Sequence, residues 1–139
     1  MIRAEYYETL PQIGRQIREE VFMTEQGFSY DYDETDEVAV HFVLWDGENA
    51  VAACRAFRGE EEGVFVLGRL AVKKECRGKK LGSTLLGAVA DYVKNQKGRC
   101  IILHSQLDAK DFYSKNGFSE YGEIEYEEDC PHIWMKKEI

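Results

Sequence analysis

The fold of this chain is decided by residues 64–93, which read VFVLGRLAVKKECRGKKLGSTLLGAVADYV. The run Val64–Val72 is rich in strand-forming apolar residues and predicts a buried strand. After a basic turn that contains two glycines, apolar residues return at helical spacing from Leu81 onward. The pattern ends near Lys97-Gly98, where a glycine commonly terminates a helix. The segment therefore predicts a strand, a basic turn and an amphipathic helix.

The turn between this strand and this helix has the properties of an anion site. It reads Arg77-Gly78-Lys79-Lys80-Leu81-Gly82-Ser83. The first turn of a helix offers backbone N–H groups that have no partner within the helix, and the helix dipole adds positive charge there. Gly78 and Gly82 let a phosphate approach the backbone. Alternatively, the turn is an ordinary cap with solvated lysines, but basic residues at this end oppose the dipole unless an anion is bound.

Two other phosphate-binding motifs do not fit this turn. The dinucleotide fingerprint needs G-x-G-x-x-G and an acidic residue about twenty positions later, whereas the glycines here are spaced G-x-x-x-G. The P-loop needs G-K-[S/T], which the sequence lacks. Both classes are therefore disfavoured.

The rest of the sequence predicts antiparallel hairpins before this segment and a second strand–helix unit after it. Asp46-Gly47 is a strong hairpin signal, and Asn116-Gly117 closes a short helix. The expected strands are 2–7, 38–45, 50–57, 64–72, 100–103, 118–126 and 132–137. Helices are expected from residue 9, from residue 81 and over 108–116, and residues 24–37 are expected to form an acidic loop. This order predicts an α/β (α+β) fold in one domain, 1–139, with helices packed on a mixed sheet.

Composition narrows the choice of partners. The net charge of −8 disfavours nucleic acid, which needs a broad basic surface. The acidic excess favours a cationic partner such as an amine, or merely keeps the protein soluble. No apolar run is long enough for a membrane, and the charged N-terminus resembles no signal peptide, so we expect a cytoplasmic protein. The four cysteines match no zinc pattern, so we expect free thiols and no metal.

The basic turn also carries a resemblance to a known family. Leu70-Ala71-Val72, followed after four residues by Arg77–Gly82, resembles the acetyl-CoA motif Q/R-x-x-G-x-G/A of the GNAT N-acetyltransferase superfamily, with Lys80 in place of the central glycine. Gln106 through Tyr113 to Asn116-Gly117-Phe118 resembles a later motif of the same family. Three further stretches resemble its small bacterial ElaA-like branch: residues 21–26, the acidic run that extends to His41, and residues 128–133.

This resemblance implies a co-substrate and a sheet geometry. Acetyl-CoA would lie between two splayed parallel strands, Val64–Val72 and Cys100–Leu103, in a sheet of six to seven strands with about four helices. The implied cofactor-binding residues are Leu70, Ala71, Val72, Arg77, Gly78, Lys79, Lys80, Leu81, Gly82, Ser83, Gln106 and Tyr113. The backbone N–H of Val72 or a neighbour is the implied partner of the thioester carbonyl.

Amine acylation also requires proton transfer, because a lysine-like amine with a pKa of ~10.4 is mostly protonated at neutral pH. The candidate bases are Glu25, Asp36, His41 and His132, and the strand Val64–Val72 itself carries no carboxylate. Each candidate has a purely structural alternative, such as a loop cap or a buried hydrogen bond.

The resemblance makes Tyr113 the general acid for the departing thiolate. Proton transfer from a phenol to a thiolate is uphill by roughly 2 kcal/mol. A hydrogen bond from the phenol to the charge that develops on the sulfur requires less than full proton transfer. In the alternative interpretation, Tyr113 is a packed core tyrosine beside Phe112.

The acceptor is expected to be a primary amine of a small molecule or a peptide. The acidic loop Tyr30–Glu37 occupies the position where the family admits its acceptor, and it either attracts a cationic amine or is a solvated surface. Three alternatives stay open: a non-catalytic acyl-CoA-binding module on the same fold, transfer to a hydroxyl, and a homodimer.

Overall fold

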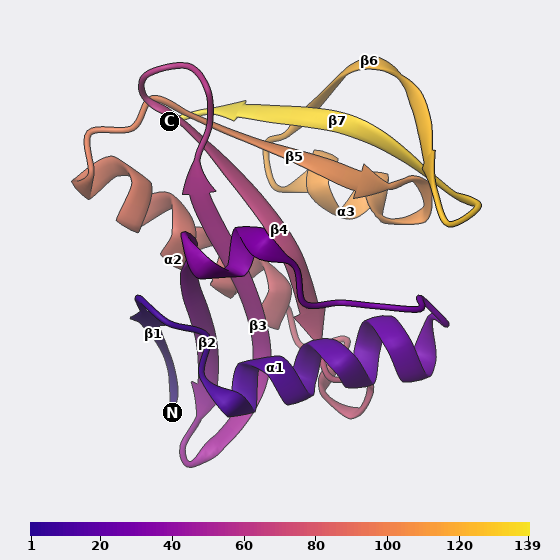
Figure 1. Cartoon of the computed structure of the whole chain (residues 1–139). Coiled ribbons are helices and arrows are strands. Elements are labelled where there is room, and N and C mark those ends of the chain that lie inside the picture. Colours follow the sequence, from indigo (N-terminus) through magenta and orange to yellow (C-terminus); the bar gives the residue numbers. More distant parts are fainter. The chain divides into compact units, whose positions relative to one another are not determined.

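Seven strands are hydrogen-bonded in the order β1-β2-β3-β4-β5-β7-β6 (Figure 1). The computed structural model describes residues 1–139. The strands are β1 Ile2–Tyr7, β2 Val40–Asp46, β3 Asn49–Arg58, β4 Val64–Val72, β5 Cys100–Gln106, β6 Ser119–Glu127 and β7 Cys130–Glu138. The α-helices are α1 Gln12–Arg18, α2 Leu81–Asn95 and α3 Lys110–Lys115. The sheet is mixed, because β4 and β5 are parallel while the pairs β1–β2, β2–β3, β5–β7 and β6–β7 are antiparallel.

The residues group into two compact units. Unit 1 comprises Met1–Phe57 and Gly68–Val89, and unit 2 comprises Arg58–Leu67 and Ala90–Ile139. Strand β4 and helix α2 each contribute residues to both units.

Unit 1 is built on the antiparallel strands β1, β2 and β3. Gly47 has φ +61 and turns the chain between β2 and β3, as the Asp46-Gly47 signal predicts. Seven consecutive residues of β3 are buried, so this strand is covered on both faces. The core cluster of unit 1 consists of Ile17, Val21, Val43, Ala50, Ala53 and Ala71.

The first helix continues past α1 as a π-helix, η1, over Glu19–Glu25, and the two form one coil in Figure 1. Gln26 N–H donates to the carbonyl of Val21 at 3.0 Å, which is the wider bond of a π-turn. The sequence predicts that the helix ends near Thr24, and the structure agrees. The following loop also contains a 3₁₀ turn, η2, at Glu34–Glu37, where Asp33 and Asp36 form a capping box.

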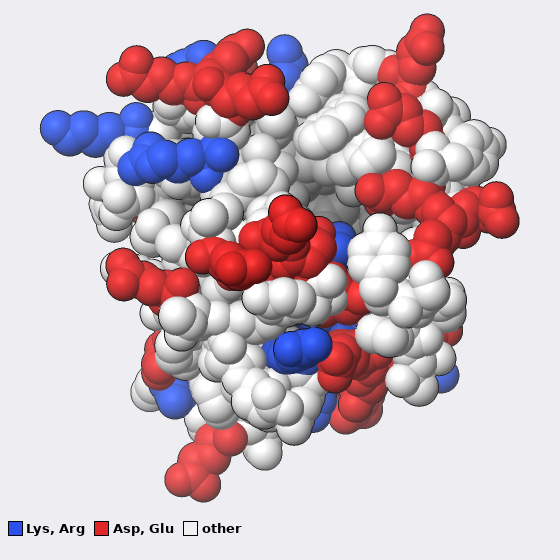
Figure 2. All heavy atoms as spheres, viewed as in Figure 1, with Lys and Arg blue, Asp and Glu red and all other residues white.

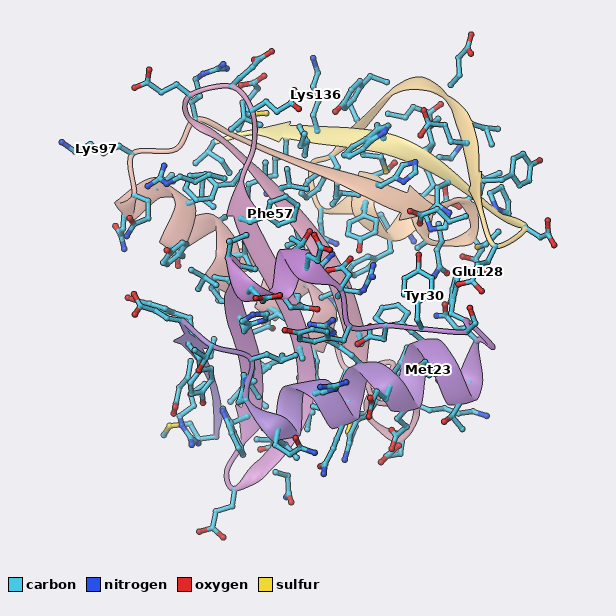
Figure 3. All side chains as sticks on the ribbon, viewed as in Figure 1. Met23, Tyr30, Phe57, Lys97, Glu128 and Lys136 are labelled. Carbon is cyan, nitrogen blue, oxygen red and sulfur yellow. The ribbon has the colours of Figure 1, made fainter.

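In unit 2, residues Val64–Leu67 of β4 pair with Cys100–Leu103 of β5, and β5 pairs in turn with β7. Helix α3 packs against β5 and β6. Gly98, after the end of α2, is required by close packing, because a Cβ there would lie 2.4 Å from Val93 Cγ1. Lys97, labelled in Figure 3, has φ +63 and ends the helix one position before that glycine.

The predicted elements differ from the observed ones mainly in length. Strand β5 extends to Gln106 instead of Leu103, and β7 begins at Cys130 instead of His132. The helix predicted over 108–116 is a 3₁₀ turn, η4 Leu107–Ala109, followed by α3. Three α-helices, with the π-helix and the short 3₁₀ turns between them, stand where about four helices were expected. None of the helices is both long enough and apolar enough to traverse a lipid bilayer.

Candidate functional site

The basic turn leads into α2 through two left-handed residues. After the 3₁₀ turn η3, Lys74–Cys76, Gly78 has φ +84 and Lys80 has φ +61. A glycine adopts such angles freely, whereas a residue with a Cβ does so at a cost of roughly 1–2 kcal/mol. Lys80 therefore has a left-handed backbone conformation that a glycine would adopt without this cost. Nothing lies within 4 Å of a Cβ added to Gly78, so that position demands glycine for its φ and not for space.

The strain at Lys80 gives a testable difference between two substitutions. Lys80→Gly and Lys80→Ala remove the same charge, but only glycine also removes the left-handed penalty. We expect Lys80→Gly to be more stable to unfolding than Lys80→Ala by about 1 kcal/mol. Urea titration of both variants measures this difference. Equal midpoints would show that Lys80 is not left-handed in solution.

Arg77 is held on two sides within unit 1. Its Nε donates to the carbonyl of Val72 at 3.1 Å, and its two terminal nitrogens donate to Glu25 at 2.6 and 2.7 Å. The bidentate pair joins the basic turn to the end of η1. The hydrogen bond from Arg77 lowers the pKa of Glu25, and the same pair raises the pKa of Arg77. Glu25 is therefore a weaker base than an ordinary glutamate and serves to fix the turn.

This contact gives Glu25 a structural role, which can be tested by the kinetics of a variant. Glu25→Gln keeps the shape of the side chain and removes its charge, so the turn loses its clamp. We expect KM for acetyl-CoA to rise roughly threefold, because the pair is partly exposed, while kcat holds. Steady-state kinetics test this, with Glu19→Gln on the same helix as a matched control, because Glu19 pairs with Arg15. A loss of kcat with an altered pH profile would instead make Glu25 a base.

The acidic loop is neutralised by arginines. Asp31 and Asp36 are fully buried, and Asp33 is about one-third exposed. Arg18 donates to Asp31 at 3.0 Å and to Asp36 at 2.7 Å. The complete buried ion cluster consists of Arg18, Arg55 and Arg69 with Asp31, Asp33 and Asp36. Three of the loop's carboxylates are thus matched by guanidinium groups, whereas Glu34 and Glu37 are exposed.

Burial tends to raise the pKa of Asp36, but hydrogen bonds from Arg18 and from the backbone of Asp33 outweigh it and lower that pKa well below its usual range. Such a carboxylate is held as an anion and is poorly suited to accept a proton. Asp36 therefore belongs to the architecture of the loop.

His41 lies beside this cluster and is 1% exposed. Its Nε2–H donates to the carbonyl of Asp36 at 2.9 Å, and its Nδ1 has no hydrogen-bond partner. Burial lowers the pKa of His41. The nitrogen that carries the lone pair is enclosed, so the structure places this candidate base in the protein interior.

Unit 2 contains Tyr113 and Gln106. Tyr113, on α3, is 8% exposed, and its ring makes edge contacts with Phe112 at 5.1 Å and Phe118 at 5.7 Å. Gln106 ends β5 and is the register partner of His132 on β7. The predicted site residues Gln106 and His132 are therefore neighbours in the sheet.

His132 belongs to a cluster of imidazoles and carboxylates that the sequence did not predict. Its ring lies 4.9 Å from that of His104, which stacks on Trp134 at 4.7 Å. Glu127 approaches His132 Nε2 at 3.2 Å, and Glu125 approaches His104 Nε2 at 3.4 Å. Burial and the neighbouring His132 lower the pKa of His104, whereas the two glutamates oppose this shift.

The turn between β6 and β7 sets this cluster in place. Glu128 and Asp129 have φ +47 and +66, which makes the connection a tight two-residue hairpin turn. Glu128 is labelled there in Figure 3. The turn pairs Glu127 with Cys130 and Glu125 with His132.

Sequence reasoning missed Arg18, Arg55, Arg69 and His104. In a sequence pattern, a buried arginine on a helix looks the same as an exposed one, and Arg18 is 1% exposed. The only available signal was the excess of aspartates in residues 31–36, because buried carboxylates need cationic partners.

Comparisons with known proteins agree with this architecture. Residues 13–139 match the family model of the acetyltransferase (GNAT) domain. The uncharacterized N-acetyltransferase YjcF of Bacillus subtilis is 31% identical over 125 residues, which are 88% of each chain. Protein ElaA of Escherichia coli is 27% identical over 129 residues, 89% of this chain and 84% of ElaA.

Two solved structures resemble the chain over its whole length. The crystal structure of Escherichia coli ElaA has a TM-score of 0.85 at 28% identity and covers 99% of both chains. An acyl-CoA N-acyltransferase from Pseudomonas aeruginosa, with a TM-score of 0.84 at 24% identity over 99% of both chains, shares the fold. The chain therefore belongs to the GNAT acetyltransferase family, resembles its ElaA-like members and is an N-acetyltransferase.

Proposed function

We propose that this enzyme moves the acetyl group of acetyl-CoA to a primary amine of a small molecule or peptide, by direct attack of the amine in a ternary complex. Residues 1–139 would form one N-acetyltransferase domain. The observation that carries the proposal is the basic turn before α2, where the left-handed residues Gly78 and Lys80 lead directly into the start of the helix.

The residues of this turn fit a pyrophosphate group. The N–H groups of Leu81, Gly82 and Ser83 belong to the first turn of α2 and have no carbonyl partner within the helix. Lys79 and Lys80 add exposed positive charge beside them. Arg77 fixes the turn to η1 through Glu25 and to the end of β4 through Val72. We propose that Leu70, Ala71 and Val72 line the pantetheine arm and that a backbone N–H of Val72 polarises the thioester carbonyl.

The acetyl group is transferred when the amine nitrogen bonds to the thioester carbonyl carbon and the C–S bond breaks. We propose that Tyr113 donates a hydrogen bond to the departing sulfur, and that Gln106 lies beside the cofactor. Negative charge develops on the sulfur as the bond breaks, so a donor placed there stabilises the transition state more than the bound substrate.

An assay of acetyl-CoA consumption against a panel of amines tests this function. Free CoA and acetylated amine are best quantified by chromatography with mass detection, because the free thiols of Cys76 and Cys130 are only partly buried and would react with thiol reagents. We expect turnover of at least one amine class. Binding of acetyl-CoA by calorimetry without turnover of any amine would favour the non-catalytic alternative.

A further inference from the structure

The cluster on β5, β6 and β7 contains an uncommon contact between two hydrogen-bond acceptors. His132 Nδ1 lies 2.9 Å from the carbonyl of Cys130, and a carbonyl only accepts, so Nδ1 carries the hydrogen. In the neutral ring, Nε2 then has the lone pair. That lone pair faces a carboxylate oxygen of Glu127 at 3.2 Å. Two acceptors in contact need a proton or a cationic donor between them.

The sheet register places the whole cluster on one face. His132 is opposite Gln106 on β5 and opposite Glu125 on β6, while His104 is opposite Trp134. Side chains two apart on a strand share a face, and so do directly opposite residues. Glu127, His104 and Trp134 therefore lie on the same face as His132 and Gln106. Gln106, which is proposed above to lie beside the cofactor, thus shares a face with His132.

The cluster is enclosed on its aromatic side and open on its acidic side. His132 is 4% exposed, and its ring lies against His104. Glu127 has a side chain that is 57% exposed. Acidic side chains border the hairpin of β6 and β7 at the right of Figure 2, where residues 123–129 are exposed. An ammonium group can thus approach from solvent along the carboxylates.

We propose that His132 Nε2 and Glu127 bind the ammonium group of the acceptor and that Nε2 takes its proton. An ammonium supplies the missing donors to both acceptors at once. This inference rests on the proposed amine acetylation and names its proton acceptor. Of the three ammonium hydrogens, one passes to Nε2 and on to water, one ends on the CoA thiol, and one stays on the amide nitrogen. His104 is a positioning residue that holds the His132 ring in place.

Several ionisable groups lie around the pair. They are His104 from β5, Glu125 and Glu127 from β6, Cys130 from β7 and Asp108 from η4. Glu125, Glu127 and Asp108 are carboxylates, so the surroundings favour a cationic ligand such as an ammonium group.

Three variants test the proposal through the pH dependence of kcat/KM. His132→Gln removes the proton acceptor, and we expect kcat at neutral pH to fall about 10²–10⁴-fold, with the acid limb abolished. Glu127→Gln removes the carboxylate that faces Nε2, so we expect kcat/KM for the amine to fall roughly threefold across the pH range, a modest loss because that carboxylate is exposed. His104→Phe keeps an aromatic ring against His132 and is expected to lower kcat/KM less than His132→Gln does. Glu123→Gln, the same charge change elsewhere on β6, leaves the profile unchanged.

Two amines of well-separated pKa show which group causes the acid limb of the pH profile. If an ionisable group of the enzyme causes it, the limb lies at the same pH for both amines. Turnover by His132→Gln with an unaltered profile would overturn the proposal while leaving amine acetylation intact. A second measurement needs no turnover: n-butylammonium chloride is titrated into protein labelled with ¹³C-histidine. We expect the His132 resonance to shift in the wild type and to lose that response in Glu127→Gln. No shift in the wild type would also overturn the proposal, whereas a shift without turnover of any amine would refute only the acetylation.

Discussion

Tyr113→Phe is expected to lower kcat by about 10- to 100-fold while the Kd for CoA stays within a factor of about two, because a hydrogen bond to a charged group contributes roughly 1.5–3 kcal/mol. The phenylalanine ring fills the same space between Phe112 and Phe118, so helix α3 keeps its packing. Only the hydroxyl is lost, and with it the proposed donor to the departing sulfur.

Steady-state kinetics give kcat, and calorimetry with CoA gives Kd. Tyr121→Phe provides the matched control, because it removes a hydroxyl from a partly exposed tyrosine on β6. If Tyr113→Phe turns over at the wild-type rate, the tyrosine is a core residue and has no part in the chemistry. A parallel loss of kcat and CoA binding would instead indicate a packing defect.

The second large effect concerns the buried ion cluster. Asp36→Ala leaves Arg18 and Arg55 with an uncompensated charge in the interior, and we expect the free energy of unfolding to fall by about 3–5 kcal/mol. This is a large share of the roughly 5–15 kcal/mol that stabilises a typical domain. Urea titration measures the loss as a lower midpoint at constant slope.

Two further variants isolate the cause. Glu34→Gln changes a neighbouring exposed carboxylate and is expected to alter stability by less than about 0.5 kcal/mol. The double variant Arg18→Met with Asp36→Leu removes one charge of each sign and replaces a buried pair with apolar groups, which regains most of the loss. A loss below about 1 kcal/mol in Asp36→Ala, or no rescue in the double variant, would contradict a dominant role of the cluster in stability.

The same cluster makes the free energy of unfolding depend on pH in the acid range. Because the pKa of Asp36 is lower in the folded state than in the unfolded chain, its contribution is complete above about pH 4, the ordinary range of an aspartate. The contribution declines as the pH falls through the folded-state value. Asp36→Ala should lack this acid-dependent part of the stability.

Local patterns were sufficient for most elements of the fold. The strand 64–72 was predicted with the bounds that β4 has, and the helix beginning at Leu81 was placed correctly. Strand alternation, the Asp46-Gly47 turn and the helical stripe of α2 are all read from residues close in sequence. Errors lay mainly at element ends such as those of β5 and β7, where pairing with a neighbouring strand extends the ladder beyond what local preference supports.

The candidate site was predicted less completely. The turn Arg77–Ser83 could be found because glycines, basic residues and a helix start leave a local signature. The roles of Glu25 and His41 could not, because each depends on a partner brought close by folding: Arg77 is 52 residues from Glu25. In the same way, Arg18 is 18 residues from Asp36, and an ion pair with such a separation has no local pattern.

The sequence by itself determined the strand–turn–helix segment, because its pattern follows from neighbouring residues. The prediction that its turn binds an anion rests on the same local residues and on the unpaired N–H groups of a helix start. The tertiary structure alone decided which acidic groups are free to react. It bound Glu25 to Arg77, enclosed the aspartates of the loop among arginines, and set Glu127 against His132 across the β6–β7 hairpin. Proton affinity depends on burial and on charges within a few ångströms, and those neighbours are chosen by the fold.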